Sequence, residues 1–73
     1  MITVKVVRQS SGNPAVGEEV SLGFGFGRGV TGRERTDSNG EAHFDADNGE
    51  GEVYVNGSQK HKGYLSGRVV VYI

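Results

Sequence analysis

Apolar and polar residues alternate with a period of two along much of this chain. The alternation is clearest at residues 2–6, 20–26, 53–55 and 69–73. Successive side chains of an extended strand point to opposite faces of a sheet, so the pattern indicates strands with one buried face. No stretch places apolar residues at i, i+3, i+4 and i+7, and each of the 13 glycines would cost about 1 kcal/mol inside a helix. We therefore expect essentially no helix.

Turn-forming residues interrupt the alternation at residues 10–14, 37–40, 48–49 and 56–58. Asparagine and glycine tolerate the positive φ of tight hairpins, and Asp37 suits the first position of a type I turn that ends at Gly40. The turns divide the chain into six or seven strands, expected at about 2–8, 18–26, 29–36, 41–45, 50–56, 58–64 and 66–73. Many short strands with closely spaced turns predict an all-β fold, a small antiparallel β-sandwich with Greek-key-like connections.

The length of 73 residues indicates a single domain over residues 1–73, and no linker or internal repeat interrupts it. A domain of this size buries only about 60% of the surface that its unfolded chain exposes. Nearly every large apolar side chain is therefore needed in the core, and few remain to line a deep pocket. The absence of cysteine excludes disulfides, a thiolate nucleophile and zinc sites of the cysteine type.

Two phrases of the sequence, Gly12–Leu22 and Thr36–Phe44, read as turns that lead into strands. A Gly-Tyr pair followed by a valine-rich C-terminal strand completes the pattern. The positions that carry it are Pro14, Gly17, Val20, Thr36, Asp37, Asn39, Gly40, Phe44, Gly63, Tyr64, Val69 and Val71. These residues resemble the signature of carboxypeptidase regulatory-like, or transthyretin-like, β-sandwich domains, and the resemblance spans nearly the whole chain. It implies an adhesion, transport or enzyme-accessory module, commonly extracellular and embedded in a longer chain.

The run Gly23–Gly29 departs from the pattern of that family, which has an ordinary strand and loop there. We expect Phe24 and Phe26 to face the core, with the glycines relieving crowding or permitting a bulge. A second reading makes Phe24, Phe26 and Arg28 a surface for a protein or small molecule. A third has the phenylalanines stack on single-stranded nucleic acid, assisted by Arg33 and Arg35, but the net charge of −1 argues against general nucleic-acid affinity. The G-x-G-x-x-G match at residues 27–32 is not followed by a helix and does not indicate a dinucleotide site.

Metal-binding and catalytic patterns are weak in this sequence. Asp45, Asp47 and Glu50 surround a turn with oxygen ligands and are weak calcium candidates, although an exposed acidic tip is the preferred interpretation. His43 and His61 are far apart in the sequence, and no further histidine or cysteine completes a transition-metal site unless their strands are neighbours. No Gly-x-Ser-x-Gly elbow is present. We therefore predict no cofactor, no metal and no enzymatic activity.

These observations favour a non-enzymatic structural or protein-interaction module. Besides residues 23–29, the segment containing Lys60, Lys62 and Tyr64 is a candidate contact surface. The first alternative is a carbohydrate- or small-molecule-binding module that uses surface aromatics, and the second is single-stranded nucleic-acid binding through residues 23–35. The segment Gly67–Ile73 carries no charge after Arg68, so pairing at this edge, including a homodimer, is a further expectation.

The N-terminal segment Met1–Lys5 lacks the basic and apolar regions of a secretory signal, and no apolar run approaches the length of a membrane span. We expect a cytoplasmic protein if the chain is full-length, an extracellular one if it is an excised domain, and no membrane partner.

Overall fold

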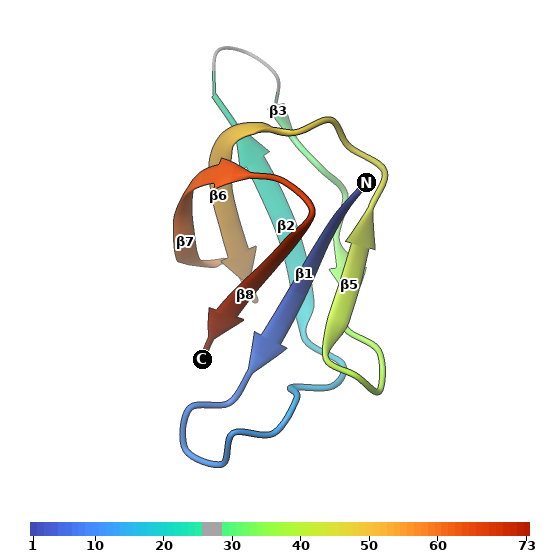
Figure 1. Ribbon diagram of the computed structural model, residues 1–73, viewed down its shortest axis with the longest axis vertical. Helices are drawn as coiled ribbons and strands as arrows, with labels where there is room; N and C mark the ends of the chain where they lie inside the picture. Colours follow the sequence, from blue (N-terminus) through green and yellow to red (C-terminus); the bar gives the residue numbers. More distant parts are fainter. Residues whose placement is uncertain (26–28) are drawn as a thin grey trace.

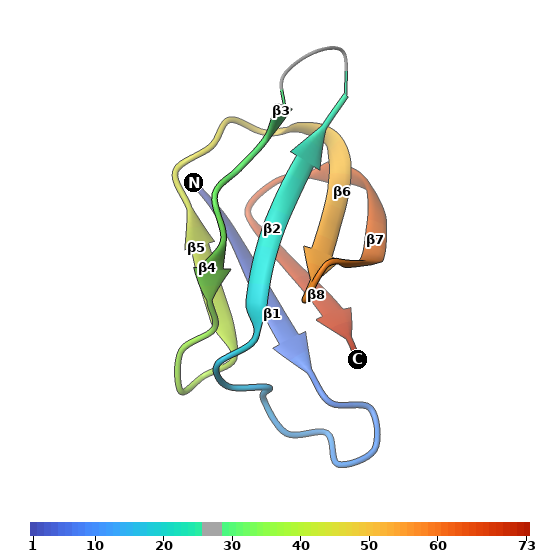
Figure 2. The same ribbon diagram turned by 180° about the vertical axis from the view of Figure 1, so that it is seen from behind.

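The computed structural model describes residues 1–25 and 29–73, and these residues form eight β-strands and no helix. The strands are β1 (Ile2–Val7), β2 (Glu19–Phe24), β3 (Gly29–Val30), β4 (Glu34–Arg35), β5 (Glu41–Phe44), β6 (Gly49–Val55), β7 (Ser58–Leu65) and β8 (Arg68–Tyr72). They pack as two sheets, seen from opposite sides in Figures 1 and 2. The predicted all-β sandwich is confirmed.

The smaller sheet has the strand order β5-β1-β8, and the larger has the order β3-β2-β6-β7 with β4 also paired to β2. All pairs of strands are antiparallel except β1 and β8, which run parallel with Val4 beside Val69. The chain reaches β8 by crossing from β7 in the other sheet (Figure 1). A return of this kind can place the last strand parallel to the first, which no local hairpin could do.

The inward positions of the alternating stretches fill the space between the sheets. Ile2, Val4 and Val6 of β1 are fully buried, as are Val20 and Leu22 of β2. The remaining buried apolar residues are Ala15, Ala42, Phe44, Val53, Val55, Leu65, Val69 and Val71, and Phe24, Ala46 and Ile73 pack against this core. The period of two therefore identified the buried face of β1, β2, β6 and β8 correctly, whereas β7 carries no such alternation.

The two phrases Gly12–Leu22 and Thr36–Phe44 meet in space. The buried Thr36 hydroxyl donates to the carbonyl oxygen of Ala15 at 2.5 Å and accepts from the amide of Glu18 at 2.9 Å. Gly40 has a φ of +75°, and a Cβ there would lie 2.7 Å from the carbonyl oxygen of Val6 and 2.9 Å from Cβ of Pro14. The phrases thus build one joint that connects the two sheets at this end of the sandwich.

The strand expected at 29–36 is divided into β3 and β4, and both pair with β2. Thr31 is the physical cause, because its hydroxyl accepts from the amide of Leu22 at 2.9 Å, where a strand carbonyl would otherwise bond. The turn at 37–40 forms as expected, with the amide of Gly40 bonded to the carbonyl of Asp37. It leads from β4 in one sheet to β5 in the other, so it is a corner between sheets and not the hairpin that the sequence suggested.

The hairpin at Asn56-Gly57 is confirmed. Both residues have positive φ, 52° and 85°, as a two-residue type I′ turn requires, and Val55 pairs with Ser58. The ladder between β6 and β7 shifts register between Val53 and Tyr54. A bulge of this kind increases the local twist of the outer strand β7.

Within the described residues, the structure contains no helix with the length and apolar character needed to cross a membrane.

Candidate functional site

The structure separates the predicted interaction residues of the glycine–phenylalanine run. Phe24 is half-buried and packs against the core, as expected. Phe26 and Arg28 lie outside the described residues. Arg33 and Arg35, which the nucleic-acid reading required, both form ion pairs with Glu19, at 3.7 and 3.0 Å. In the described part of the chain, both arginines therefore lie beside a carboxylate, and Arg33 also lines a pocket with Tyr54.

Lys60, Lys62 and Tyr64 are exposed on β7, the outer strand of the larger sheet. Lys62 is paired in register with Glu52, and Tyr64 with Glu50. Opposite charges at facing positions of neighbouring strands, such as Lys62 and Glu52, stabilise the pairing of β6 with β7. Lysines on an outer strand, together with the bulge beside Tyr54, oppose the addition of another strand at β7.

The three tyrosines do not share one surface. Tyr54 and Tyr64 alternate with buried residues of β6 and β7 and face outward from the larger sheet, whereas Tyr72 faces outward from the smaller one. Tyr54 lies across Gly23, where a Cβ would come within 3.0 Å of the ring. It also borders a pocket of about 250 Å³ formed with Glu19, Ser21, Val30, Arg33 and Gly57. Small-molecule binding stays a prediction, and in this structure it would use the Tyr54 pocket and not a continuous aromatic strip.

The hydroxyl of Tyr54 donates a hydrogen bond to Glu52 Oε1 at 3.2 Å. Burial of the phenol raises the pKa of Tyr54 above its usual value, and the negative charge of Glu52 raises it further. The phenol is therefore neutral at physiological pH and acts as a hydrogen-bond donor.

The smaller sheet ends at β8, and none of the described strands pairs with its outer edge. The carbonyls of Gly67 and Ile73 accept from the amides of Thr3 and Gln9 on the β1 side. Because alternate residues of a strand direct their backbone groups to opposite sides, those of Arg68, Val70 and Tyr72 point to the open edge.

The side chains at the β8 edge are largely apolar. Val70 is 43% exposed and Tyr72 is 55% exposed, whereas Val69 and Val71 between them are buried. A shallow groove of about 400 Å³ lies beside Tyr72 and is lined by Val7, Arg8, Gln9 and Gly12. The edge therefore offers free backbone groups, two apolar side chains and an adjoining hollow.

The structure does not gather the predicted calcium residues. Asp45, Asp47 and Glu50 are all exposed. Among the described residues, the one group of three or more potential metal ligands that converges is formed by Asp37, Glu41 and His43, whose ligand atoms lie within 4.8 Å of one another. His43 and His61 lie on β5 and β7, which belong to different sheets and do not pair.

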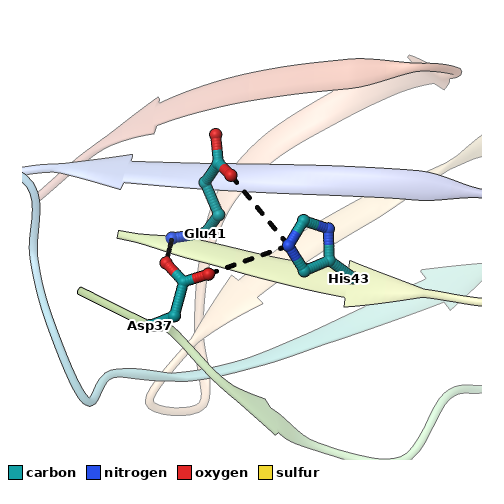
Figure 3. A group of neighbouring side chains, drawn as sticks. All are labelled: Asp37, Glu41 and His43. Carbon is teal, nitrogen blue, oxygen red and sulfur yellow. Dashed lines mark hydrogen bonds and ion pairs between the residues drawn. The ribbon is translucent and has the colours of Figure 1, made fainter. Parts of the chain in front are cut away.

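Figure 3 shows how Asp37, Glu41 and His43 face one another. Glu41 and His43 are two residues apart on β5 and share its outer face, and Asp37 stands on the turn that precedes the strand. His43 Nε2 lies 3.8 Å from Asp37 Oδ2 and 4.0 Å from Glu41 Oε1. The sequence reading missed this group, because it explained Asp37 as a turn residue and His43 as an isolated surface imidazole. The available signal was an acid and a histidine at i and i+2 directly after an aspartate turn.

In each of these three side chains, the polar atom that points away from the centre of the group contacts another residue. Asp37 Oδ1 accepts from the amides of Asn39 and Glu41 at 2.9 and 3.0 Å. Glu41 Oε2 lies 2.8 Å from Arg68 Nη2, and His43 Nδ1 lies 2.9 Å from Thr3 Oγ1. Each side chain therefore has one fixed atom and directs the other toward the centre of the group.

The amide of Glu41 and then that of Asn39 are the main causes that lower the pKa of Asp37, because both bonds stabilise the carboxylate form. The nearby imidazole of His43 lowers it slightly further. Asp37 is therefore ionised through the physiological range.

Comparison with protein-family models, with curated proteins and with solved structures gives no match to this chain.

Proposed function

We propose that this protein is a non-enzymatic β-sandwich module of the carboxypeptidase regulatory-like, or transthyretin-like, type that binds another protein by strand addition along β8. The family assignment rests on the phrases quoted above, and the joint between Gly12–Leu22 and Thr36–Phe44 gives those residues a common structural purpose. The binding mode rests on one observation, the open edge of β8 with the exposed apolar side chains of Val70 and Tyr72.

Strand addition uses backbone hydrogen bonds for affinity and alternate side chains for specificity. At β8 the outward backbone groups belong to Arg68, Val70 and Tyr72, and the side chains of these same residues are exposed. An antiparallel partner strand would place apolar side chains beside Val70 and Tyr72. The preferred occupant is thus an extended apolar segment of another protein.

The matched pair of variants for this proposal is Val70→Lys and Val30→Lys. Both valines are exposed, but Val30 lies on β3 in the other sheet. Peptides selected against the wild-type chain from a random 12-residue library serve as the probe. We expect Val70→Lys to weaken their binding at least about tenfold, because a charged side chain on an edge opposes pairing, while Val30→Lys leaves it unchanged.

Amide hydrogen exchange locates the contact. The amides of Arg68, Val70 and Tyr72 should gain protection in the complex, since these are the groups that face the edge. Equal binding of peptides to Val70→Lys and the wild type, or protection confined to β7, would contradict the proposal. Sedimentation velocity over a concentration series shows whether a second copy of the chain occupies the same edge, in which case Val70→Lys abolishes the association.

A further inference from the structure

We propose that Asp37, Glu41 and His43 form a binding site for a divalent transition-metal ion such as Zn²⁺. The ligand atoms are His43 Nε2, Asp37 Oδ2 and Glu41 Oε1, which converge on the outer face of β5 (Figure 3). This inference does not depend on strand addition at β8, because none of the three residues belongs to that edge.

The separations from His43 Nε2 to the two carboxylate oxygens fit a shared ion, and the two carboxylate oxygens lie within 4.8 Å of each other. The 3.8 and 4.0 Å distances from His43 Nε2 to the two carboxylate oxygens exceed the length of a hydrogen bond. Zinc binds histidine nitrogen and carboxylate oxygen at about 2.0–2.2 Å, so two ligands on one ion lie roughly 3.3–4.2 Å apart. The fixed outer atoms of the same side chains, in contrast, meet their partners at 2.8–3.0 Å. Within this group, the separations longer than a hydrogen bond are therefore those between the converging atoms.

The surrounding residues provide the outer contacts that metal ligands usually have. A ligating imidazole typically bonds through its other ring nitrogen, which fixes its orientation. Here Thr3 Oγ1 lies 2.9 Å from His43 Nδ1, and acceptance of a hydrogen bond from Nδ1–H leaves the lone pair of Nε2 available. Arg68 orients Glu41 from β8, two strands away from β5, and the turn amides orient Asp37.

The donor set indicates the class of ion. One imidazole nitrogen with two carboxylate oxygens suits Zn²⁺, Co²⁺, Mn²⁺ or Ni²⁺, whereas calcium takes six to eight oxygen ligands. Three protein ligands leave at least one coordination position for water. Half of the surface of His43 and of Asp37 is accessible, 49% and 47%, so the ion can enter directly from solvent.

The experiment is isothermal titration of the full chain, prepared without a histidine tag, with ZnCl₂ at about pH 7.5. Absorption spectroscopy with Co²⁺ reports the coordination independently. We expect one ion per chain. His43→Gln removes the nitrogen donor, and Asp37→Asn removes a charge but keeps the Oδ1 acceptor of the turn, so each should weaken binding at least about tenfold.

The matched control is His61→Gln, which removes the other histidine, on β7 of the opposite sheet. It should bind Zn²⁺ with the affinity of the wild type. Circular dichroism confirms that each variant is folded, and all three substituted side chains are at least partly exposed. No binding by the folded wild type at millimolar Zn²⁺, or unchanged affinity in both His43→Gln and Asp37→Asn, would overturn the proposal.

Discussion

The two outer strands of the smaller sheet, β5 and β8, flank the same central strand and yet present opposite chemistry. β5 is polar on its outer face, carries Glu41 and His43, and lies beside β4 of the other sheet (Figure 2). β8 exposes Val70 and Tyr72, and no described strand joins its outer edge. The two outer strands of one sheet thus differ in their surroundings, because β5 lies beside β4 without pairing to it, whereas no described strand pairs with β8 on its outer edge.

The strongest test of this comparison uses the glycines that precede the two strands. Gly40 and Gly67 both have positive φ, which costs an alanine about 1–2 kcal/mol in either position. At Gly40 the added Cβ would also meet the Val6 carbonyl at 2.7 Å, whereas at Gly67 it meets nothing within 4 Å. We expect Gly40→Ala to lose about 1–3 kcal/mol more of unfolding free energy than Gly67→Ala.

Urea denaturation followed by circular dichroism measures both variants. A Gly40→Ala variant that unfolds even without urea agrees with the expectation, because a domain of this size has little stability to spare. Equal losses at the two positions would show that the β5 edge is not tightly joined to β1 and Pro14.

A smaller effect is expected for the one ion pair that connects the two edges in the described structure. Arg68 of β8 reaches across β1 to Glu41 of β5, with 2.8 Å between Nη2 and Oε2. Arg68 is 56% exposed, so the pair should contribute about 0.2–1 kcal/mol. A double-mutant cycle with Arg68→Met and Glu41→Gln measures the coupling.

Salt provides the check on that coupling energy. At about 1 M NaCl the Debye length falls to about 3 Å, so most of the coupling should disappear. A coupling that persists unchanged in high salt would mean that packing, and not charge, connects the two edges.

The smallest effect is the pH response of the β5 edge. The folded-state pKa of Asp37 lies below the ordinary value of an aspartate, so the carboxylate form stabilises the fold. That stabilisation is present above about pH 4 and is lost as the pH falls through the folded pKa. The asparagine of Asp37→Asn does not titrate, so the urea midpoints of wild type and variant should converge between about pH 5 and about pH 2.

The metal-free chain is required for this pH series. A constant difference between the two midpoints over the whole range would show that the turn amides do not distinguish the carboxylate from the acid. Val70→Lys, at the other edge of the sheet, is the control. The difference between its urea midpoint and that of the wild type should not change between about pH 5 and about pH 2.

Much of the fold follows from local patterns. The alternation predicted β1, β2, β6 and β8 to within a few residues, because the burial of every second side chain is a property of each strand separately, and the turns on either side bounded β7. The same reasoning failed at 29–36, where the hydroxyl of Thr31 bonds the amide of Leu22 and interrupts the strand. A single side-chain hydrogen bond to the neighbouring strand leaves no periodic signal in the sequence.

The candidate sites were less predictable than the strands. The β8 edge was expected, because the segment Gly67–Ile73 carries no charge after Arg68. Its apolar character is visible in the sequence without any knowledge of its neighbours in the fold. The group of Asp37, Glu41 and His43 was not expected, although all three lie within seven residues of one another. Its convergence depends on the corner at Gly40, and its outer contacts come from Thr3 and Arg68, which are distant in the sequence.

Period-two patterning and turn chemistry were thus sufficient for an all-β chain, the buried residues of its alternating strands and most of its turns, because the alternation is encoded within a few residues, whereas they did not predict the burial of Ala15 and Thr36. The order of the strands, the parallel pairing of β1 with β8 and the difference between the β5 and β8 edges arose only in the folded sandwich. Contacts between segments as far apart as Thr3 and Arg68 depend on how the whole chain packs, and short-range sequence patterns do not encode that.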